Sequence, residues 1–266
     1  MKRFLLYSFL CLSSFVFSQT NNPKELDSIT KVRRQYYQKE LQLLEEKCKQ
    51  DSKRAEEDSK YNFTYSLSTT TPASGSDFFP AEKELIAELR KYNIGYGGYI
   101  LGNCFGLPTN CYQIEMTRLS KQKFGEAFFV SRKQEALKTF LKKNPQYIFE
   151  FEQCERTSRY ASAKDISEMF HQLHLDLEKK IIYPKEFNFK KEDERKSYSH
   201  VSFVLNTDGK ASNIYINTDF KNKKNYAFTE FMHEQITKFV KSAKWKPAAY
   251  ASIPVKSKMT ISIEYQ

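Results

Sequence analysis

Residues 201–217 read VSFVLNTDGKASNIYIN and predict a β-hairpin. Residues 201–206 alternate in the period-two pattern of a strand that has at least one buried face. The Asp208-Gly209 pair that follows is a strong turn signal, because glycine supplies the positive φ that a tight hairpin needs. Ile214 and Ile216 then continue the alternation on a return strand.

The chain after this hairpin predicts one helix and one more strand. Residues 226–244 carry apolar side chains mostly on one side of a helix, and residues 253–265 include a period-two run. A ββαβ unit with one helix buries one face of its sheet and leaves the other in water. Together with the region before it, this predicts an α+β fold.

The motifs of this last third occur in the order seen in one known family. They are Tyr183-Pro184, Asp208-Gly209, Trp245 followed by Pro247-Ala248, and Ile253-Pro254-Val255 leading into Lys258-Met259-Thr260-Ile261. In this order they resemble the C-terminal domain of the TonB energy-transducer family, over roughly residues 168–266. A helix that begins at Ser162 or Asp165 precedes them, so we expect this domain to occupy residues 161–266.

The resemblance implies a non-catalytic protein that binds an outer-membrane TonB-dependent receptor, or another envelope protein, through a sheet edge. Strand addition uses the unpaired backbone groups of an edge strand to hold an extended peptide. By resemblance, the partner-binding residues are Tyr183, Pro184, Lys258, Met259, Thr260, Ile261, Ser262 and Ile263. The residues expected to act structurally are Asp208, Gly209, Trp245, Pro247 and Ala248. Lys256 and Lys258 either attract an acidic peptide or protect the edge against aggregation.

The N-terminus predicts export, and the resemblance implies that the destination is the periplasm of a Gram-negative cell. Lys2 and Arg3 precede an apolar run over residues 4–17, and modest side chains lie before Gln19, so residues 1–18 read as a cleaved signal peptide. The run is shorter than the roughly 20 residues needed to cross a bilayer. If it is retained, the alternative is a TonB energy transducer anchored in the inner membrane for TonB-dependent transport. The net charge of +11 favours acidic partners, while export argues against nucleic acid.

The rest of the chain divides by composition. Residues 19–60 predict a charged amphipathic helix, either a short coiled coil or spacer, or a solvated helix docked on the body. Residues 61–78 predict a linker, and residues 79–160 a small α+β domain of unknown family. Within that domain we expect helices over 80–92 and from Ser131, and strands over 94–101, 111–118, 126–130 and 146–153.

The cysteines of the exported chain permit two disulfides with three connectivities. They are Cys48, Cys104, Cys111 and Cys154. A bridge between Cys104 and Cys111 would close the turn around Gly106 and Pro108. The alternative is that some of these cysteines are small buried apolar residues.

Two constellations raise the question of chemistry. His171 and His174, with Glu168 and Asp176 nearby, offer metal-ligand types on one helix, but a polar helix face explains them better. Cys104 and His200 superficially resemble a Cys/His cell-wall peptidase, which is a remote alternative. We therefore expect no catalytic residue, metal, cofactor or small-molecule substrate. The competing class is a structural envelope protein whose edge pairs with its own copy as a homo-oligomer.

Overall fold

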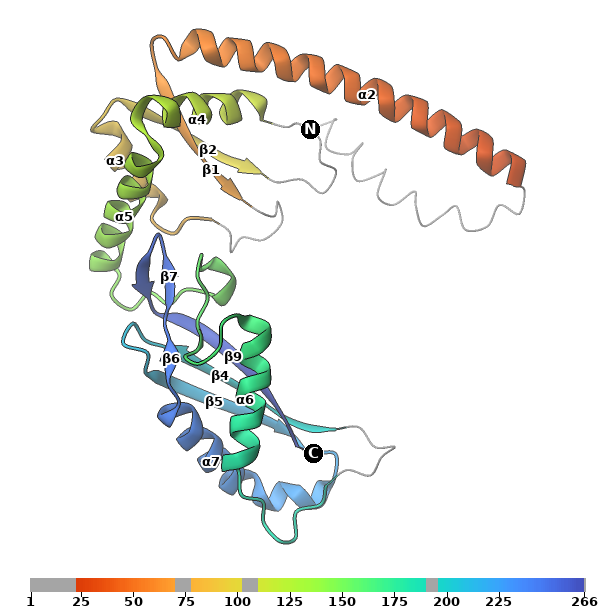
Figure 1. The fold of residues 1–266 in the computed structure, drawn as a ribbon, viewed down its shortest axis with the longest axis vertical. Helices are drawn as coiled ribbons and strands as arrows, with labels where there is room; N and C mark the ends of the chain where they lie inside the picture. The colour runs from red at the N-terminus through yellow and green to blue at the C-terminus, as the bar shows by residue number, and fades with distance from the viewer. Residues whose placement is uncertain (1–22, 70–77, 102–109, 190–195, 266) are drawn as a thin grey trace.

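The computed structural model describes residues 23–69, 78–101, 110–189 and 196–265 (Figure 1). The fold is α+β, as predicted. Its helices are α2 (Pro23–Asp58), α3 (Glu82–Arg90), α4 (Cys111–Phe124), α5 (Glu126–Lys143), α6 (Ile166–Lys180) and α7 (Thr229–Ser242), with short 3-10 turns η3 (Phe151–Gln153) and η4 (Lys223–Phe228). Its strands are β1 (Phe63–Thr69), β2 (Ile94–Leu101), β3 (Arg159–Tyr160), β4 (Ser197–Leu205), β5 (Ala211–Asp219), β6 (Trp245–Lys246), β7 (Ala248–Tyr250), β8 (Ile253–Val255) and β9 (Ser257–Tyr265).

The predicted hairpin is the centre of a three-stranded antiparallel sheet ordered β5-β4-β9. Its turn needs glycine for two reasons. Gly209 has a φ of 78°, and a Cβ there would lie 2.7 Å from the carbonyl oxygen of Trp245. Asp208 holds the turn, because its Oδ1 accepts a hydrogen bond of 3.0 Å from the N–H of Lys210. Both residues therefore shape this turn.

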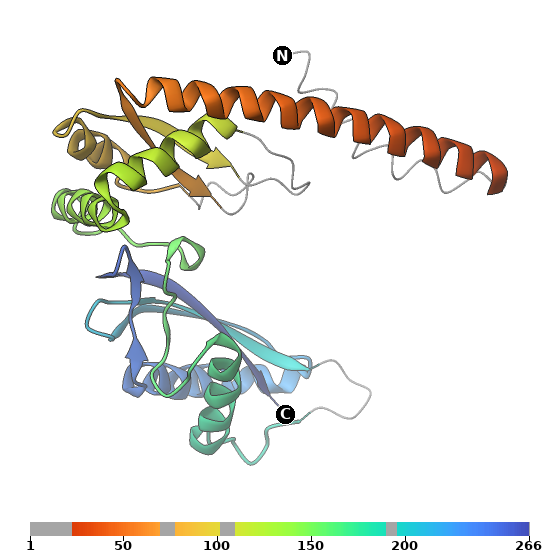
Figure 2. The same cartoon turned by 45° about the horizontal axis from the view of Figure 1, so that its top comes forward.

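One face of this sheet is covered and the other is open. Figure 2 shows α6 and α7 beneath the sheet, and their apolar residues form one core with the inward side chains of the strands. Helix α6 begins where the sequence predicts, because the side chain of Asp165 accepts a hydrogen bond from the N–H of Glu168. Exposed or half-exposed side chains on the opposite face include His200, Ser202, Tyr215, Asn217, Thr260 and Ser262.

A second core lies around the parallel pair β1-β2 and helices α3 and α5. The linker prediction for 61–78 is wrong over Phe63–Thr69, which form β1, while 70–77 lie outside the described residues. The strands expected over 111–118 and 126–130 are helical. Tertiary packing explains both helices, because Met116 and Ser120 are buried together at helical spacing and Phe129 is buried in the core.

The hairpin β7-β8 joins the two parts of the molecule. It belongs to the C-terminal third of the sequence, but Ala248, Tyr250 and Val255 are buried in the second core. Its turn uses Ala251 and Ser252, both at positive φ (46° and 63°). Such residues are costly in this conformation, since only glycine adopts it freely.

Contacts from the second core hold this unfavourable turn in place. The Glu155 carboxylate accepts a hydrogen bond of 2.8 Å from the N–H of Ala251, and the Gln134 side-chain amide donates one of 3.0 Å to its carbonyl. The predicted boundary between 79–160 and 161–266 therefore does not separate two cores, because residues from both sides of it build the second core.

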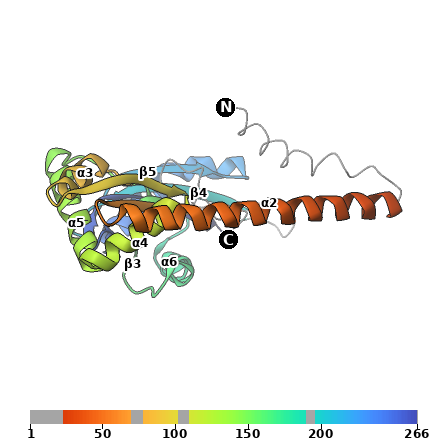
Figure 3. The same cartoon turned by 90° about the horizontal axis from the view of Figure 1, so that it is seen from above.

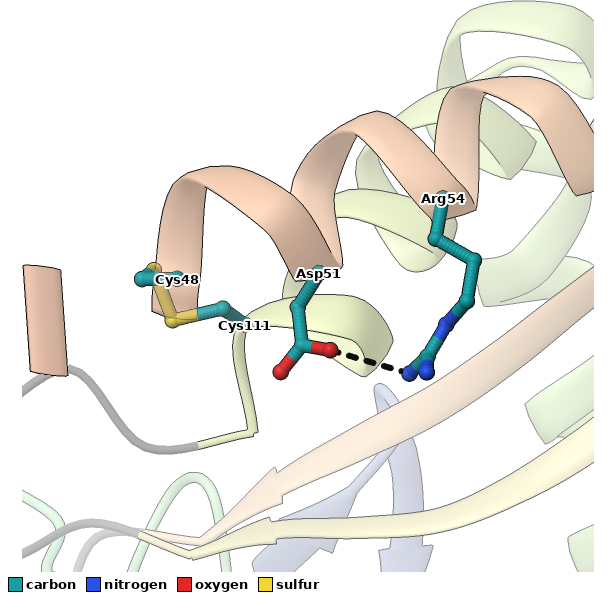
Figure 4. The surroundings of a disulfide bond; sticks show 4 residues. All are labelled: Cys48, Asp51, Arg54 and Cys111. Atoms are coloured by element: carbon teal, nitrogen blue, oxygen red, sulfur yellow. Dashed lines mark ion pairs between the residues drawn. A yellow bond between two sulfur atoms is a disulfide. The ribbon is translucent and has the colours of Figure 1, made fainter. Parts of the chain in front are cut away.

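The disulfide differs from the one expected. Cys111 pairs with Cys48, with an S–S distance of 1.97 Å, and thereby ties the start of α4 to α2 (Figure 4). Cys104 lies outside the described residues, and the expected pair Cys104–Cys111 is wrong because Cys111 is already bonded. Cys154 is a buried thiol, and burial raises its pKa to about 12, so it remains protonated.

The strand expected over residues 146–153 and the possibility of a membrane-spanning helix remain to be compared with the structure. Residues 146–153 do not form a strand; they contain one isolated bridge at Phe149 and the turn η3. In the part of the chain that the structure describes, no helix is long and apolar enough to cross a membrane. The apolar run of residues 4–17 lies outside that part.

Candidate strand-addition site

Strand β9 forms one edge of the C-terminal sheet. It pairs with β4 along its whole length, from Ser257 opposite Leu205 to Tyr265 opposite Ser197. On its other side, the described residues supply one partner, Phe149, which forms an isolated parallel bridge at Ser257. The edge is therefore closed at its beginning and open beyond it.

Phe149 shows which residues of β9 face outward. Its N–H donates to the carbonyl of Lys256 at 2.9 Å, and its carbonyl accepts from the N–H of Lys258 at 2.9 Å. Since backbone groups in an antiparallel pair alternate between the two sides of a strand, Thr260 and Ser262 also direct theirs away from β4, and so does Glu264. The open edge is the stretch Thr260–Glu264.

The side chains of β9 alternate between core and solvent. Ser257, Met259, Ile261, Ile263 and Tyr265 are buried, whereas Lys258, Thr260, Ser262 and Glu264 are exposed. Of the expected partner-binding residues, Met259, Ile261 and Ile263 therefore pack in the core and direct their backbone toward β4. Their packing holds the strand against the core, while Thr260 and Ser262 between them direct their backbone groups outward.

The lysines expected to attract an acidic peptide already have partners. Lys258 forms an ion pair with Glu150, the residue after Phe149. Lys256 donates a hydrogen bond of 3.1 Å to the carbonyl of Pro145. Both side chains therefore fasten β9 to the chain around Phe149, and the charge of Lys258 is already paired with a carboxylate.

Tyr183 lies near the far end of β9. Its ring centroid is 6.3 Å from that of Tyr265 and 5.0 Å from that of Phe187, within an aromatic cluster. Burial raises the pKa of Tyr183 to about 12, so its hydroxyl stays protonated at physiological pH. Pro184 begins the turn after it, where its carbonyl accepts from the N–H of Phe187 at 3.0 Å. Tyr183 therefore supports the end of the edge strand through ring contacts, and Pro184 forms part of the turn that follows it.

The motif Trp245-x-Pro247-Ala248 has a packing role. The indole N–H of Trp245 donates to the carbonyl of Val240 at 3.0 Å, and its ring contacts Tyr160 and Phe203 at centroid distances of 5.3 and 5.2 Å. Ala248 is fully buried in the second core. Trp245 therefore closes one core immediately before the chain enters the other.

The residues considered for chemistry lie elsewhere. On α6, His174 Nε2 is 3.1 Å from a carboxylate oxygen of Glu178, and Asp176 accepts a hydrogen bond of 2.8 Å from the hydroxyl of Tyr160. Among the residues with described positions, no group of three His, Cys, Asp or Glu side chains could hold a metal ion. His200 lies exposed on the open sheet face, and its suggested partner Cys104 is outside the described residues.

Sequence reasoning missed Phe149 as part of the site. The alternation over residues 146–153 predicted a strand there, and the single bridge at Phe149 is what remains of that strand. No family model, curated protein or solved structure matches the chain. The site is therefore argued from its own geometry and from the motifs in the sequence.

Proposed function

We propose that this protein is an exported, non-catalytic binding protein of the cell envelope that takes up an extended segment of a partner as an added strand on β9. The observation that carries the proposal is the open stretch Thr260–Glu264 beside a well-paired β4. An outer-membrane receptor, or another envelope protein, is the partner that the TonB-like motif order favours.

The open stretch offers a partner mainly backbone hydrogen bonds. Thr260, Ser262 and Glu264 each present one backbone donor and one acceptor outward. A net gain of about 0.5–1.5 kcal/mol per hydrogen bond fits a weak, reversible complex with an unfolded segment. The exposed side chains beside the edge are short and polar or charged, so main-chain pairing dominates over side-chain pockets.

Two alternatives use the same edge. In a structural protein the edge pairs with a second copy of the chain, which buries Thr260–Glu264 in a dimer. In an energy transducer the apolar run at 4–17 stays in the inner membrane as a tether. Sequencing the N-terminus of the protein recovered from envelope fractions distinguishes a periplasmic adaptor, which starts near Gln19, from a tethered transducer, which keeps Met1.

The direct test compares two substitutions at one outward-facing residue. Ser262→Pro removes an N–H that faces away from β4, so the sheet stays intact while the open edge loses a donor. Ser262→Ala keeps the backbone and serves as the matched control. Binding is measured by fluorescence anisotropy with labelled peptides from periplasm-facing segments of TonB-dependent receptors of the same organism.

We expect the unmodified chain and Ser262→Ala to bind one of these peptides equally, and Ser262→Pro to bind it at least about tenfold more weakly, since it loses a bond and clashes with the added strand. Equal binding by Ser262→Pro would rule out the edge. A free protein whose edge amides are already protected from hydrogen exchange would favour the self-pairing alternative.

A further inference from the structure

Helix α2 has one side that packs on the body. Ala55 is fully buried, Leu41 and Leu44 are half-buried, and Cys48 is bonded to Cys111 of α4. The contact extends to the end of the helix, where Asp58 accepts a hydrogen bond of 2.7 Å from the hydroxyl of Tyr112. The first turns of α2 run beyond the body, as Figure 3 shows from above.

A second apolar stripe lies on the opposite side of this projecting part. Val32, Tyr36 and Leu43 are 64%, 55% and 54% exposed. At 3.6 residues per turn, they lie roughly 120–160° around the helix axis from Cys48, so they face away from the body. With Lys39 between them, their spacing of four, three and four residues is the repeat of a coiled-coil seam.

This stripe is out of keeping with a helix that ends in solvent. An unsupported helix is marginally stable in water, and its stability in proteins comes from packing an apolar side. In α2 the second stripe carries the large apolar residues Val32, Tyr36 and Leu43, and no described element covers it. We propose that the stripe is a docking surface for a second copy of this chain, and that the two α2 helices pair in an antiparallel arrangement.

Charge decides between the two directions of pairing. A parallel pair would place Lys39 against Lys39 of the partner subunit in the seam, which is repulsive. An antiparallel pair centred between residues 37 and 38 instead places Leu43 against Val32 of the partner subunit, and Tyr36 against Lys39 of the partner subunit. Arg33 then lies beside Glu40 of the partner subunit on the flank of the seam.

The shape of the molecule accommodates this pair. In the antiparallel register Cys48, which the disulfide ties to the body, lies level with Asp27 of the partner subunit. The two bodies therefore sit at opposite ends of the paired helices, and Figure 2 shows α2 projecting clear of the sheet. This pairing leaves β9 free, so it is compatible with strand addition and independent of it.

The first experiment measures mass against concentration by sedimentation equilibrium on the intact protein. We expect a concentration-dependent dimer, and a dissociation constant at least about tenfold higher for Leu43→Asp, because the seam loses an apolar contact and gains a charge. Gln38→Asp is the matched control, since it adds the same charge to an exposed position outside both stripes. A chain that stays monomeric at every soluble concentration would overturn the proposal.

A charge exchange tests the direction of the pair and does not depend on how well one variant folds. Arg33→Glu and Glu40→Arg should each weaken the dimer about three- to tenfold, and the double variant should restore it. The two residues are two helical turns apart, so restoration reports contact between subunits. A double variant weaker than either single one would exclude the antiparallel register. A dimer that Ser262→Pro abolishes would place the contact at β9 instead.

Discussion

The outer edges of β1 and β9 differ in whether their backbone groups have hydrogen-bond partners among the described residues. On β1, the N–H of Ser66 donates to Thr117 Oγ1 at 3.0 Å, and Ser120 Oγ donates to the carbonyl of Thr64 at 3.0 Å, so side chains of α4 occupy the edge. On β9, Phe149 occupies the beginning of the edge and the described residues leave Thr260–Glu264 unpaired.

The difference shows that the open edge is not a general property of this fold. The chain closes the edge of β1 with short hydroxyl side chains, where an unpaired strand would invite association. It also closes β9 as far as Phe149 reaches. The remaining open stretch is therefore local, and this is the pattern expected of a binding edge.

The largest effect should come from breaking the inward side of β9. Ile261 lies opposite Val201, is buried, and directs its backbone groups toward β4. Ile261→Pro removes a ladder hydrogen bond and a core side chain, and should cost about 4 kcal/mol or more. Ser262→Pro should cost less than about 1 kcal/mol, because its N–H faces outward. Urea unfolding curves measure both. Equal costs would contradict the assignment of the two sides.

The disulfide should matter more for the edge of β1 than for that of β9. Replacing Cys48 and Cys111 together by serine should cost about 2–4 kcal/mol, since the bridge closes a long loop. It also frees the start of α4, so the N–H of Ser66 should exchange with deuterium faster. Exchange along β4 and β9 is the internal control. Unchanged protection at Ser66 would show that α4 holds its place without the bond.

A smaller effect should follow from removing one closing contact at β1. Thr117→Val keeps the shape of the side chain but leaves the buried N–H of Ser66 without its acceptor, and should cost about 1–3 kcal/mol. Thr139→Val, on the exposed side of α5, is the matched control and should stay within about 0.5 kcal/mol. A similar cost for both variants would mean that the hydroxyl of Thr117 does not close the edge.

The smallest effect concerns β5, the other edge of the C-terminal sheet. His233 on α7 lies 2.9 Å from Thr218 Oγ1, and burial lowers its pKa below the usual value of about 6.5. As pH falls through that value, the unfolded chain binds a proton before the folded one does, so stability decreases until the folded pKa is reached. Above the unfolded pKa of about 6.5, the contribution of His233 to stability is constant. His233→Gln should flatten this part of a plot of unfolding free energy against pH. An unchanged slope would assign the titration to other groups.

The C-terminal sheet was predictable because its signals are local. Period-two alternation in β4 and β9, the Asp208-Gly209 turn and the cap at Asp165 each specify structure over a few residues. Residues 111–118 of α4 and 126–130 of α5 were mistaken for strands, whereas the rest of α5, from Ser131, was predicted as a helix. In α4, Ile114 is 45% exposed and Ser120 is buried, so the sequence pattern misidentified the buried side.

The candidate site was predictable only in part. The motif order indicated the edge of β9, but the closing contact of Phe149 joins residues more than a hundred positions apart and has no local signal. The strand β1 was missed for a related reason. Its outward backbone groups at Thr64 and Ser66 bond to side chains of α4, a distant contact without a local signal, so the Ser/Thr-rich strand was read as a linker.

The position of the hairpin β7-β8 has a consequence for the order in which the protein is completed during synthesis. The second core is built mainly from the first part of the chain, up to Cys154, but it also needs Ala248 and Tyr250. About 90 residues lie between, and at about 5–20 residues per second the ribosome needs about 5–20 s to make them. During that interval Phe149 cannot pack against Tyr250, because Tyr250 has not yet been synthesised. The core that is begun first is therefore completed only when the chain is almost finished, shortly before β9 completes the other core.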